Sequence, residues 1–124
     1  MPAVPKLLAI DDEIEFTNLI SGYFGPRGYQ VLVANDGDKG LAMAKREKPD
    51  VCLIDLKMPG LHGDEVLREI LLDEPNTVCM MITASEGEGK SRQKMIEMGA
   101  CACFDKPLTS LRDLEQKIKD ALSK

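Results

Sequence analysis

Five polar residues with complementary chemistry come from separate parts of the chain, yet each one lies at, or just past, the end of a short apolar run. They are Asp11, Asp12, Asp55, Thr83 and Lys106. In an open parallel α/β sheet the carboxyl ends of the strands converge on one crevice, so residues distant in sequence become neighbours there. Three carboxylates, one hydroxyl and one ammonium group in a single pocket suit a hard cation together with a phosphoryl group.

The acidic pair Asp11 and Asp12 beside Asp55 creates a strong electrostatic repulsion. At about 4 Å and an effective dielectric constant near 20, each pair of like charges costs on the order of 4 kcal/mol. Mg²⁺ would relieve this repulsion, because it prefers oxygen ligands and keeps several of its waters. Alternatively, the two adjacent acids only cap the first helix, since aspartate is a good N-cap. A cap needs one acid rather than two that face a third, so we favour the metal site.

The same residues could transfer a phosphoryl group. A carboxylate such as Asp55 can attack phosphorus and form an acyl phosphate, and the transfer then needs mainly positioning and charge neutralisation. Lys106 can supply a positive charge to one phosphoryl oxygen, and Thr83 a hydroxyl to another. Pro107 favours extended or turn backbone at the lysine, which keeps the ammonium group at the strand end. A solvated lysine and an ordinary β-branched strand residue are the alternatives, but the joint placement at successive strand ends favours the site.

Strand-like and helical patterns alternate along the whole chain, which is typical of a parallel α/β fold. The runs at 51–55 and 77–83 are apolar on both faces and indicate central strands, whereas the run at 29–34 suits a sheet edge. The expected strands span residues 6–10, 29–34, 51–55, 77–83 and 102–105. The expected helices span residues 14–24, 38–47, 64–72, 89–98 and 111–122.

Size and composition restrict the class of protein. The 124 residues fit one domain, and we expect residues 1–124 to form it. The net charge of −5 argues against nucleic acid as a direct partner. No apolar run approaches the length of a membrane span, and the N-terminus does not resemble a secretory signal. We therefore expect a soluble, cytoplasmic protein.

The sequence does not indicate a disulfide framework or a zinc site. It contains four cysteines, Cys52, Cys79, Cys101 and Cys103, and a single histidine, His62. Disulfide frameworks belong to oxidising compartments and usually to smaller, loop-rich chains. A lone Cys-x-Cys on a strand lacks the partner ligands of a zinc site. We predict reduced cysteines in the core, because free cysteine is strongly buried, and a surface or helix-capping role for the histidine.

Four sequence motifs resemble those of the receiver domains of two-component response regulators. They are LAIDDE at 8–13, PDVCLIDLKMPG at 49–60, ITA at 82–84 and DKP at 105–107. The resemblance covers essentially the whole chain. It implies a flavodoxin-like (βα)5 doubly wound sandwich, with a five-stranded parallel sheet in the order 2-1-3-4-5.

The resemblance also implies roles for individual residues. Asp55 corresponds to the phosphoacceptor of the family. Mg²⁺ is bound by Asp12, by Asp55 and by the backbone carbonyl of Lys57, and Asp11 acts through water. Thr83 and Lys106, by the same resemblance, hold the phosphoryl oxygens.

Four positions correspond to residues that tune receivers or report their state. Ala84 is the small residue that leaves room for the phosphate, and Lys57 and Ser85 match variable positions that tune the lifetime of the phosphoryl group. Cys103 departs from the family, which usually has an aromatic switch residue there. Phe104 is a poor substitute, because alternation along a strand aims it at the opposite face. We therefore hypothesise that the signal leaves through the helix after Thr83.

A nucleotide hydrolase is a competing class. Residues 84–91 fit a relaxed P-loop pattern between a strand and a helix, and residues 51–55 resemble a Walker B strand. However, the order of the two motifs is reversed and the chain is small for a nucleotide site. Asp11, Asp12 and Lys106 would also remain unexplained.

The favoured function is a switch that takes a phosphoryl group from a sensor histidine kinase or phosphotransfer protein onto Asp55 and later loses it by hydrolysis. We expect no enzymatic activity beyond these two reactions. The modified state would favour a protein-binding surface built from the fourth and fifth helices and the fifth strand, with neither nucleic acid nor membrane as a partner. The alternative is a degenerate receiver that acts as a constitutive interaction module. Only the departure from the family at Cys103 supports this alternative.

Overall fold

The computed structural model describes residues 4–84 and 89–124, and within these ranges five parallel strands form one sheet. The strands are β1 (Lys6–Ile10), β2 (Gln30–Ala34), β3 (Val51–Asp55), β4 (Val78–Thr83) and β5 (Ala102–Asp105). Their order across the sheet is β2-β1-β3-β4-β5. This is the doubly wound, flavodoxin-like arrangement that the sequence predicted.

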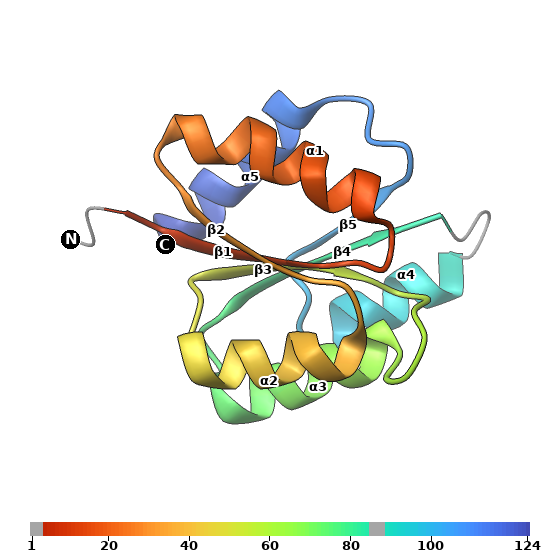
Figure 1. Cartoon of the computed structure of the whole chain (residues 1–124). Helices are drawn as coiled ribbons and strands as arrows, with labels where there is room; N and C mark the ends of the chain where they lie inside the picture. The colour runs from red at the N-terminus through yellow and green to blue at the C-terminus, as the bar shows by residue number, and fades with distance from the viewer. Residues whose placement is uncertain (1–3, 85–88) are drawn as a thin grey trace.

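Helices cover both faces of the sheet. They are α1 (Ile14–Phe24), α2 (Gly37–Glu47), α3 (Gly63–Asp73), α4 (Gly89–Glu97) and α5 (Leu111–Leu122), with a 3-10 turn, η1 (Gly25–Arg27), after α1. Figure 1 shows α1 and α5 on one face and α2, α3 and α4 on the other. Among the described residues, no helix has the length and apolar character needed to cross a membrane.

Two hydrophobic cores lie between the sheet and its helical layers. Side chains alternate along each strand, so Cys52 and Ile54 of β3 pack toward α2, α3 and α4, while Leu53 packs toward α1 and α5. Every residue of β3 is buried, as expected for a central strand, whereas Gln30 of the edge strand β2 is exposed. The predictions of central and edge strands are confirmed.

The element boundaries differ from the sequence prediction by at most one residue. β2 and β4 begin one residue later than predicted, α2 and α3 begin one residue earlier, α3 ends one residue later, and α4 ends one residue earlier. A glycine packs closely against neighbouring backbone at both of these helix starts, Gly37 against Leu61 and Gly63 against Asp55. A Cβ atom on Gly37 would lie 2.2 Å from the backbone oxygen of Leu61. Asp36 then caps α2 by accepting a hydrogen bond from the Lys39 N–H at 2.7 Å.

A buried acidic group joins the two helices of one layer. Glu115 of α5 is only 4 % exposed. Its carboxylate accepts hydrogen bonds from the Tyr23 hydroxyl at 3.1 Å and from Arg27 Nε at 2.8 Å. Because a buried charge is costly unless it is paired, this network fixes the position of α5 against α1.

The prediction for the cysteines holds for only two of the four. Cys52 and Cys79 are buried free thiols that face each other in register on β3 and β4. Cys101 is exposed and Cys103 half-buried, so the prediction of four core cysteines is wrong for this pair. The reason is position, since Cys101 precedes the edge strand β5 and Cys103 lies within it.

Candidate functional site

The register of the sheet brings the predicted site residues to one rim. The strands pair so that their carboxyl ends lie nearly level, through the pairs Ile10–Ile54, Asp55–Ile82 and Thr83–Asp105. Asp11 therefore follows its strand beside Asp55, and Lys106 follows its strand beside Thr83. The backbone confirms the second contact, because the Lys106 N–H donates to the Thr83 carbonyl at 3.0 Å.

Three carboxylates converge at this rim. One oxygen from each of Asp11, Asp12 and Asp55 lies within 4.8 Å of the other two. Asp11 and Asp55 are buried, with exposed fractions of 1 % and 7 %, while Asp12 is exposed. In the described part of the chain the N-cap of α1 is Glu13, and it makes no side-chain cap hydrogen bond. The pair Asp11 and Asp12 is therefore not explained by helix capping.

Lys106 places its ammonium group among these acids. Nζ lies 2.6 Å from Asp11 Oδ2 and 3.8 Å from Asp55 Oδ2, and it also contacts the Glu13 carboxylate. The lysine side chain is only 10 % exposed, and Nζ lies 4.8 Å from the centre of the Phe16 ring. One buried cation thus balances part of the negative charge of several carboxylates.

The electrostatics show an excess of negative charge. Burial, followed by repulsion from Asp11, raises the pKa of Asp55 from 3.8 to about 7, although Lys106 acts in the opposite direction. Burial also raises the pKa of Asp11, against the contacts with Lys106 and the Glu13 N–H that lower it. Burial alone would lower the pKa of Lys106, but its bonds to Asp11 and Glu13 outweigh this effect and raise it. The pocket would gain from a further positive charge.

A surface hollow of about 440 Å³ opens over the acids. Its lining brings together six of the predicted site residues, namely Asp12, Asp55, Lys57, Thr83, Ala84 and Lys106, and adds Glu13, which was not predicted. Asp11 is almost completely buried. Ser85, predicted as a tuning residue, lies outside the described residues.

The donor set fits a hard divalent cation. The three clustered side chains offer carboxylate oxygens only, the ligands that Mg²⁺ prefers. Asp11 Oδ2 is buried and is held by the Lys106 ammonium group at 2.6 Å, while Asp11 Oδ1 accepts a hydrogen bond from the Glu13 N–H at 2.9 Å. Asp12 and Asp55 line the hollow and are therefore the carboxylates that a cation entering it would meet first.

Two residues that support the site were not predicted from the sequence. The Asn35 side chain donates from Nδ2 to the Asp11 carbonyl at 2.9 Å, which holds the loop that carries the acidic pair. At Gly63 a Cβ atom would lie 2.1 Å from the backbone oxygen of Asp55, so only glycine allows α3 to begin this close to β3. A glycine before a helix was a weak signal, whereas nothing in the sequence indicated that Asn35 reaches another strand.

Cys103 lies beside α4 rather than in the pocket. Its carbonyl accepts a hydrogen bond from the Arg92 guanidinium at 2.8 Å, and its Sγ lies 3.8 Å from the Arg92 carbonyl. The same guanidinium pairs with Asp105. Phe104 packs in the opposite core, against α1 and α5, as strand alternation predicted.

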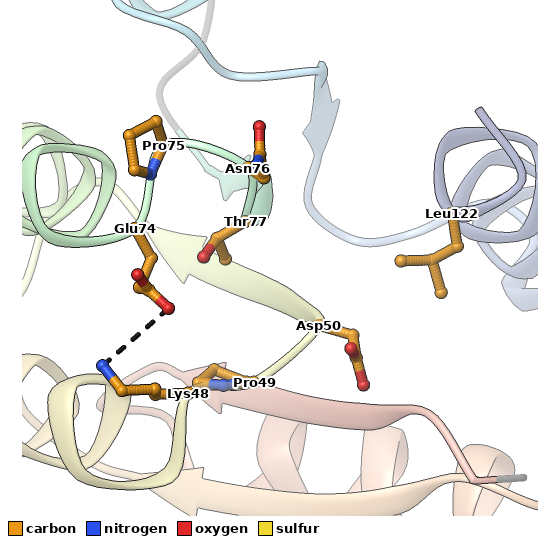
Figure 2. A pocket seen from close by; sticks show the side chains of 8 residues that line it. All are labelled: Lys48, Pro49, Asp50, Glu74, Pro75, Asn76, Thr77 and Leu122. Carbon is orange, nitrogen blue, oxygen red and sulfur yellow. Dashed lines mark ion pairs between the residues drawn. The ribbon is translucent and has the colours of Figure 1, made fainter. Parts of the chain in front are cut away.

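A second hollow lies at the other end of the strands and does not share this chemistry. Figure 2 shows its lining, which comes from the segments before β3 and β4 and from α5: Lys48, Pro49, Asp50, Glu74, Pro75, Asn76, Thr77 and Leu122. Lys48 pairs with Glu74 at 3.8 Å, and the Asp50 carboxylate accepts from the Lys6 N–H at 2.7 Å. Its acids are engaged with partners rather than gathered on a common centre.

Comparison with known proteins decides the family. The sequence model of the protein family "response regulator receiver domain" matches residues 7–119 of this chain. The chain belongs to this family. A solved receiver domain from Methanospirillum hungatei superposes with a TM-score of 0.90 at 28 % identity, over 97 % of this chain and 94 % of that one. The BeF3-activated receiver domain of RstA from Klebsiella pneumoniae gives a TM-score of 0.86 at 27 % identity, over 96 % and 99 %.

Curated relatives of this receiver differ in length. Sporulation initiation phosphotransferase F of Bacillus subtilis is 34 % identical over 119 residues, which are 96 % of this chain and 91 % of that protein. The CpxR homolog of Haemophilus influenzae, a transcriptional regulatory protein, is 39 % identical over 117 residues, 94 % of this chain but only 50 % of that protein. The receiver thus corresponds to nearly all of one relative and to half of the other.

The raised pKa of Asp55 gives a testable pH dependence of stability. Because the pKa rises from 3.8 to about 7 on folding, the unfolded chain ionises this group more easily than the folded protein does. Wild-type stability in metal-free buffer should therefore fall as the pH rises from about 4 to about 7, and then stay level. The Asp55→Asn variant has no group that ionises at this position, so its stability should not show this fall. At pH 8 we expect it to be more stable by on the order of 2 kcal/mol, with little difference at pH 4.

Urea unfolding in the presence of a chelator measures this effect. The matched control is Asp120→Asn, which removes the charge of an exposed aspartate on α5. Parallel pH profiles for wild type and Asp55→Asn would contradict the electrostatic description of the pocket.

Proposed function

We propose that this receiver accepts a phosphoryl group on Asp55 from the phosphohistidine of a sensor histidine kinase or phosphotransfer protein. The supporting observation is the position of the Asp55 carboxylate. It lines the open hollow, lies within 4.8 Å of the acids Asp11 and Asp12, and has the Lys106 ammonium at 3.8 Å. A nucleophile, a cation-binding acidic cluster and a fixed positive charge are the parts that phosphoryl transfer requires.

The transfer forms a bond from Asp55 to phosphorus as the bond to the donor breaks. An Asp55 oxygen attacks phosphorus while the P–N bond of the phosphohistidine breaks, and the leaving imidazole keeps the electron pair and takes up a proton. The product is an acyl phosphate. In the later hydrolysis, a water oxygen attacks phosphorus and loses a proton to solvent while the P–O bond to Asp55 breaks, which releases inorganic phosphate and restores the carboxylate.

Other residues of the pocket would orient these steps. Lys106 would exchange part of its contact with the acids for a phosphoryl oxygen, and the Thr83 hydroxyl would bind a second oxygen. Ala84, which is small and exposed at the rim, would leave room for the group. Lys57, also exposed, would tune the lifetime of the acyl phosphate, together with Ser85.

Mg²⁺ would be held by Asp12, Asp55 and the backbone carbonyl of Lys57, with Asp11 acting through water. When bound, it would neutralise negative charge on the phosphoryl oxygens and on the acids. The oxygen-only donor set supports this assignment.

We propose that residues 1–124 form one receiver domain in the cytoplasm, that it has no enzymatic activity beyond its own phosphorylation and dephosphorylation, and that nucleic acid and membranes are not its direct partners. The name of the Bacillus subtilis relative, a sporulation initiation phosphotransferase, supports a role in phosphoryl transfer.

We propose that the signal leaves through the surface of α4, β5 and α5. Arg92 supports this route, because it links α4 to Cys103 and Asp105 of β5, next to Lys106 in the pocket. A shift of Thr83 or Lys106 could thus reach α4 without an aromatic switch residue.

The two alternative functions fare differently. A P-loop hydrolase would not explain why Asp11, Asp12 and Lys106 converge on Asp55. Residues 85–88 of the P-loop motif lie outside the described ranges. The degenerate, constitutive module is not favoured by any contact in the pocket, and it remains an outcome of the phosphorylation experiment.

Incubation with acetyl phosphate and Mg²⁺, followed by intact mass measurement, tests the proposed acceptor. We expect wild type to gain the mass of one phosphoryl group and Asp55→Asn to gain none, because the nucleophile is lost. Asp64→Asn, a charge-matched change at the start of α3, should behave like wild type. Modification that persists in Asp55→Asn would exclude this acceptor, and no modification of wild type by any donor would favour the inert module.

The route through Arg92 is testable by NMR with beryllofluoride as a phosphoryl mimic. In wild type we expect large shift changes in residues 92–97, and in Arg92→Ala we expect them to fall by half or more, because the link to β5 is lost. Gln93→Ala, an exposed neighbour on α4, is the control. Large changes at Cys103 with none in α4 would rule this route out.

A further inference from the structure

We infer, on the basis of the phosphoacceptor role proposed for Asp55, that Glu13 is a positioning residue that restrains Lys106 in the resting receiver. Its carboxylate holds the lysine ammonium group on the side of the pocket next to β1 and α1. This contact opposes the movement of Lys106 toward an incoming phosphoryl group. Glu13 would therefore slow the acceptance of phosphate.

The position of the ammonium group carries the inference. Lys106 Nζ contacts Glu13 Oε1 and lies 2.6 Å from Asp11 Oδ2, but it is 3.8 Å from Asp55 Oδ2. The lysine ammonium group thus lies closer to Asp11 and Glu13, which precede α1, than to the acceptor Asp55. Holding a phosphoryl group on Asp55 would require the ammonium group to shift from that arrangement.

The main chain at Glu13 is held by hydrogen bonds on both sides of the residue, which places its Cα next to the pocket. The Glu13 N–H donates to Asp11 Oδ1 at 2.9 Å, and the Glu13 carbonyl accepts from the N–H groups of Phe16 and Thr17 at 3.1 and 3.2 Å. Within the described ranges this N-cap side chain makes no cap hydrogen bond to its helix. Its carboxylate is instead used on Lys106.

Exposure distinguishes Glu13 from the other partner of the lysine. The Glu13 side chain is 63 % exposed and that of Asp11 only 2 %. An exposed ion pair is weak and is screened by salt, so this contact can be exchanged for a phosphoryl oxygen while the buried contact persists. Glu13 also lines the hollow through which an anionic donor must enter, and its charge repels that donor.

The experiment compares Glu13→Gln with Glu15→Gln. Glu15 is an exposed acid in the first turn of the same helix, so both variants lose one negative charge close to the pocket. The probe is acetyl phosphate at saturating Mg²⁺, and the initial rate of mass gain is measured. We expect Glu13→Gln to react about three- to fivefold faster than wild type, the size of effect that an exposed ion pair supplies, and Glu15→Gln to react at the wild-type rate. Raising the salt concentration should narrow the difference between Glu13→Gln and wild type.

A second measurement does not depend on the reaction. The NMR signal of the Lys106 side-chain ammonium group, recorded in the unmodified proteins, should shift and exchange faster with water in Glu13→Gln, but not in Glu15→Gln. An unchanged ammonium signal, or equal rates for the two variants, would overturn the role of Glu13 while wild type is still modified on Asp55. If wild type itself is not modified on Asp55, the proposed function fails instead.

Discussion

Repulsion among three carboxylates within 4.8 Å of one another is the constraint on which this site depends. The fold brings these acids together through the parallel register of β1 and β3, and it buries two of them. Lys106 offsets part of the repulsion, yet burial, followed by the charge of Asp11, still raises the pKa of Asp55. A pocket in this condition favours a metal cation, and it gains further from chemistry that places positive charge around an oxyanion.

The two strands on the other side of β3, β4 and β5, connect the pocket to the surface. The Lys106 N–H donates to the Thr83 carbonyl, which joins the ends of β4 and β5. Arg92 of α4 holds β5 at Cys103 and Asp105 on its outer edge. In this receiver a guanidinium group thus lies beside the position where the family usually has an aromatic ring. Lys106 in the pocket is therefore linked to α4 through Asp105, its neighbour in the chain, and the Arg92 side chain.

Much of this arrangement could be predicted from the sequence, because it depends on local patterns. Apolar runs followed by polar residues located the strand ends, and parallel packing then predicted that Asp11, Asp55 and Lys106 meet. The contacts of Glu13 with Lys106 and of Asn35 with Asp11 could not be predicted, since they depend on side-chain conformations across different elements. The exposure of Cys101 was missed because the burial preference of cysteine says nothing about a position just before an edge strand.

The most direct test of the metal-binding acidic pocket is the paramagnetic broadening of amide NMR signals by Mn²⁺, which binds oxygen ligands as Mg²⁺ does. We expect a low concentration of Mn²⁺ to broaden the signals of residues 11–13, 55–57 and 83, and to leave residues 48–50 and 74–77 at the opposite end of the strands sharp. Asp12→Asn should weaken this effect, and excess Mg²⁺ should reverse it. Broadening centred on the opposite hollow, or broadening that Asp12→Asn leaves unchanged, would contradict the account.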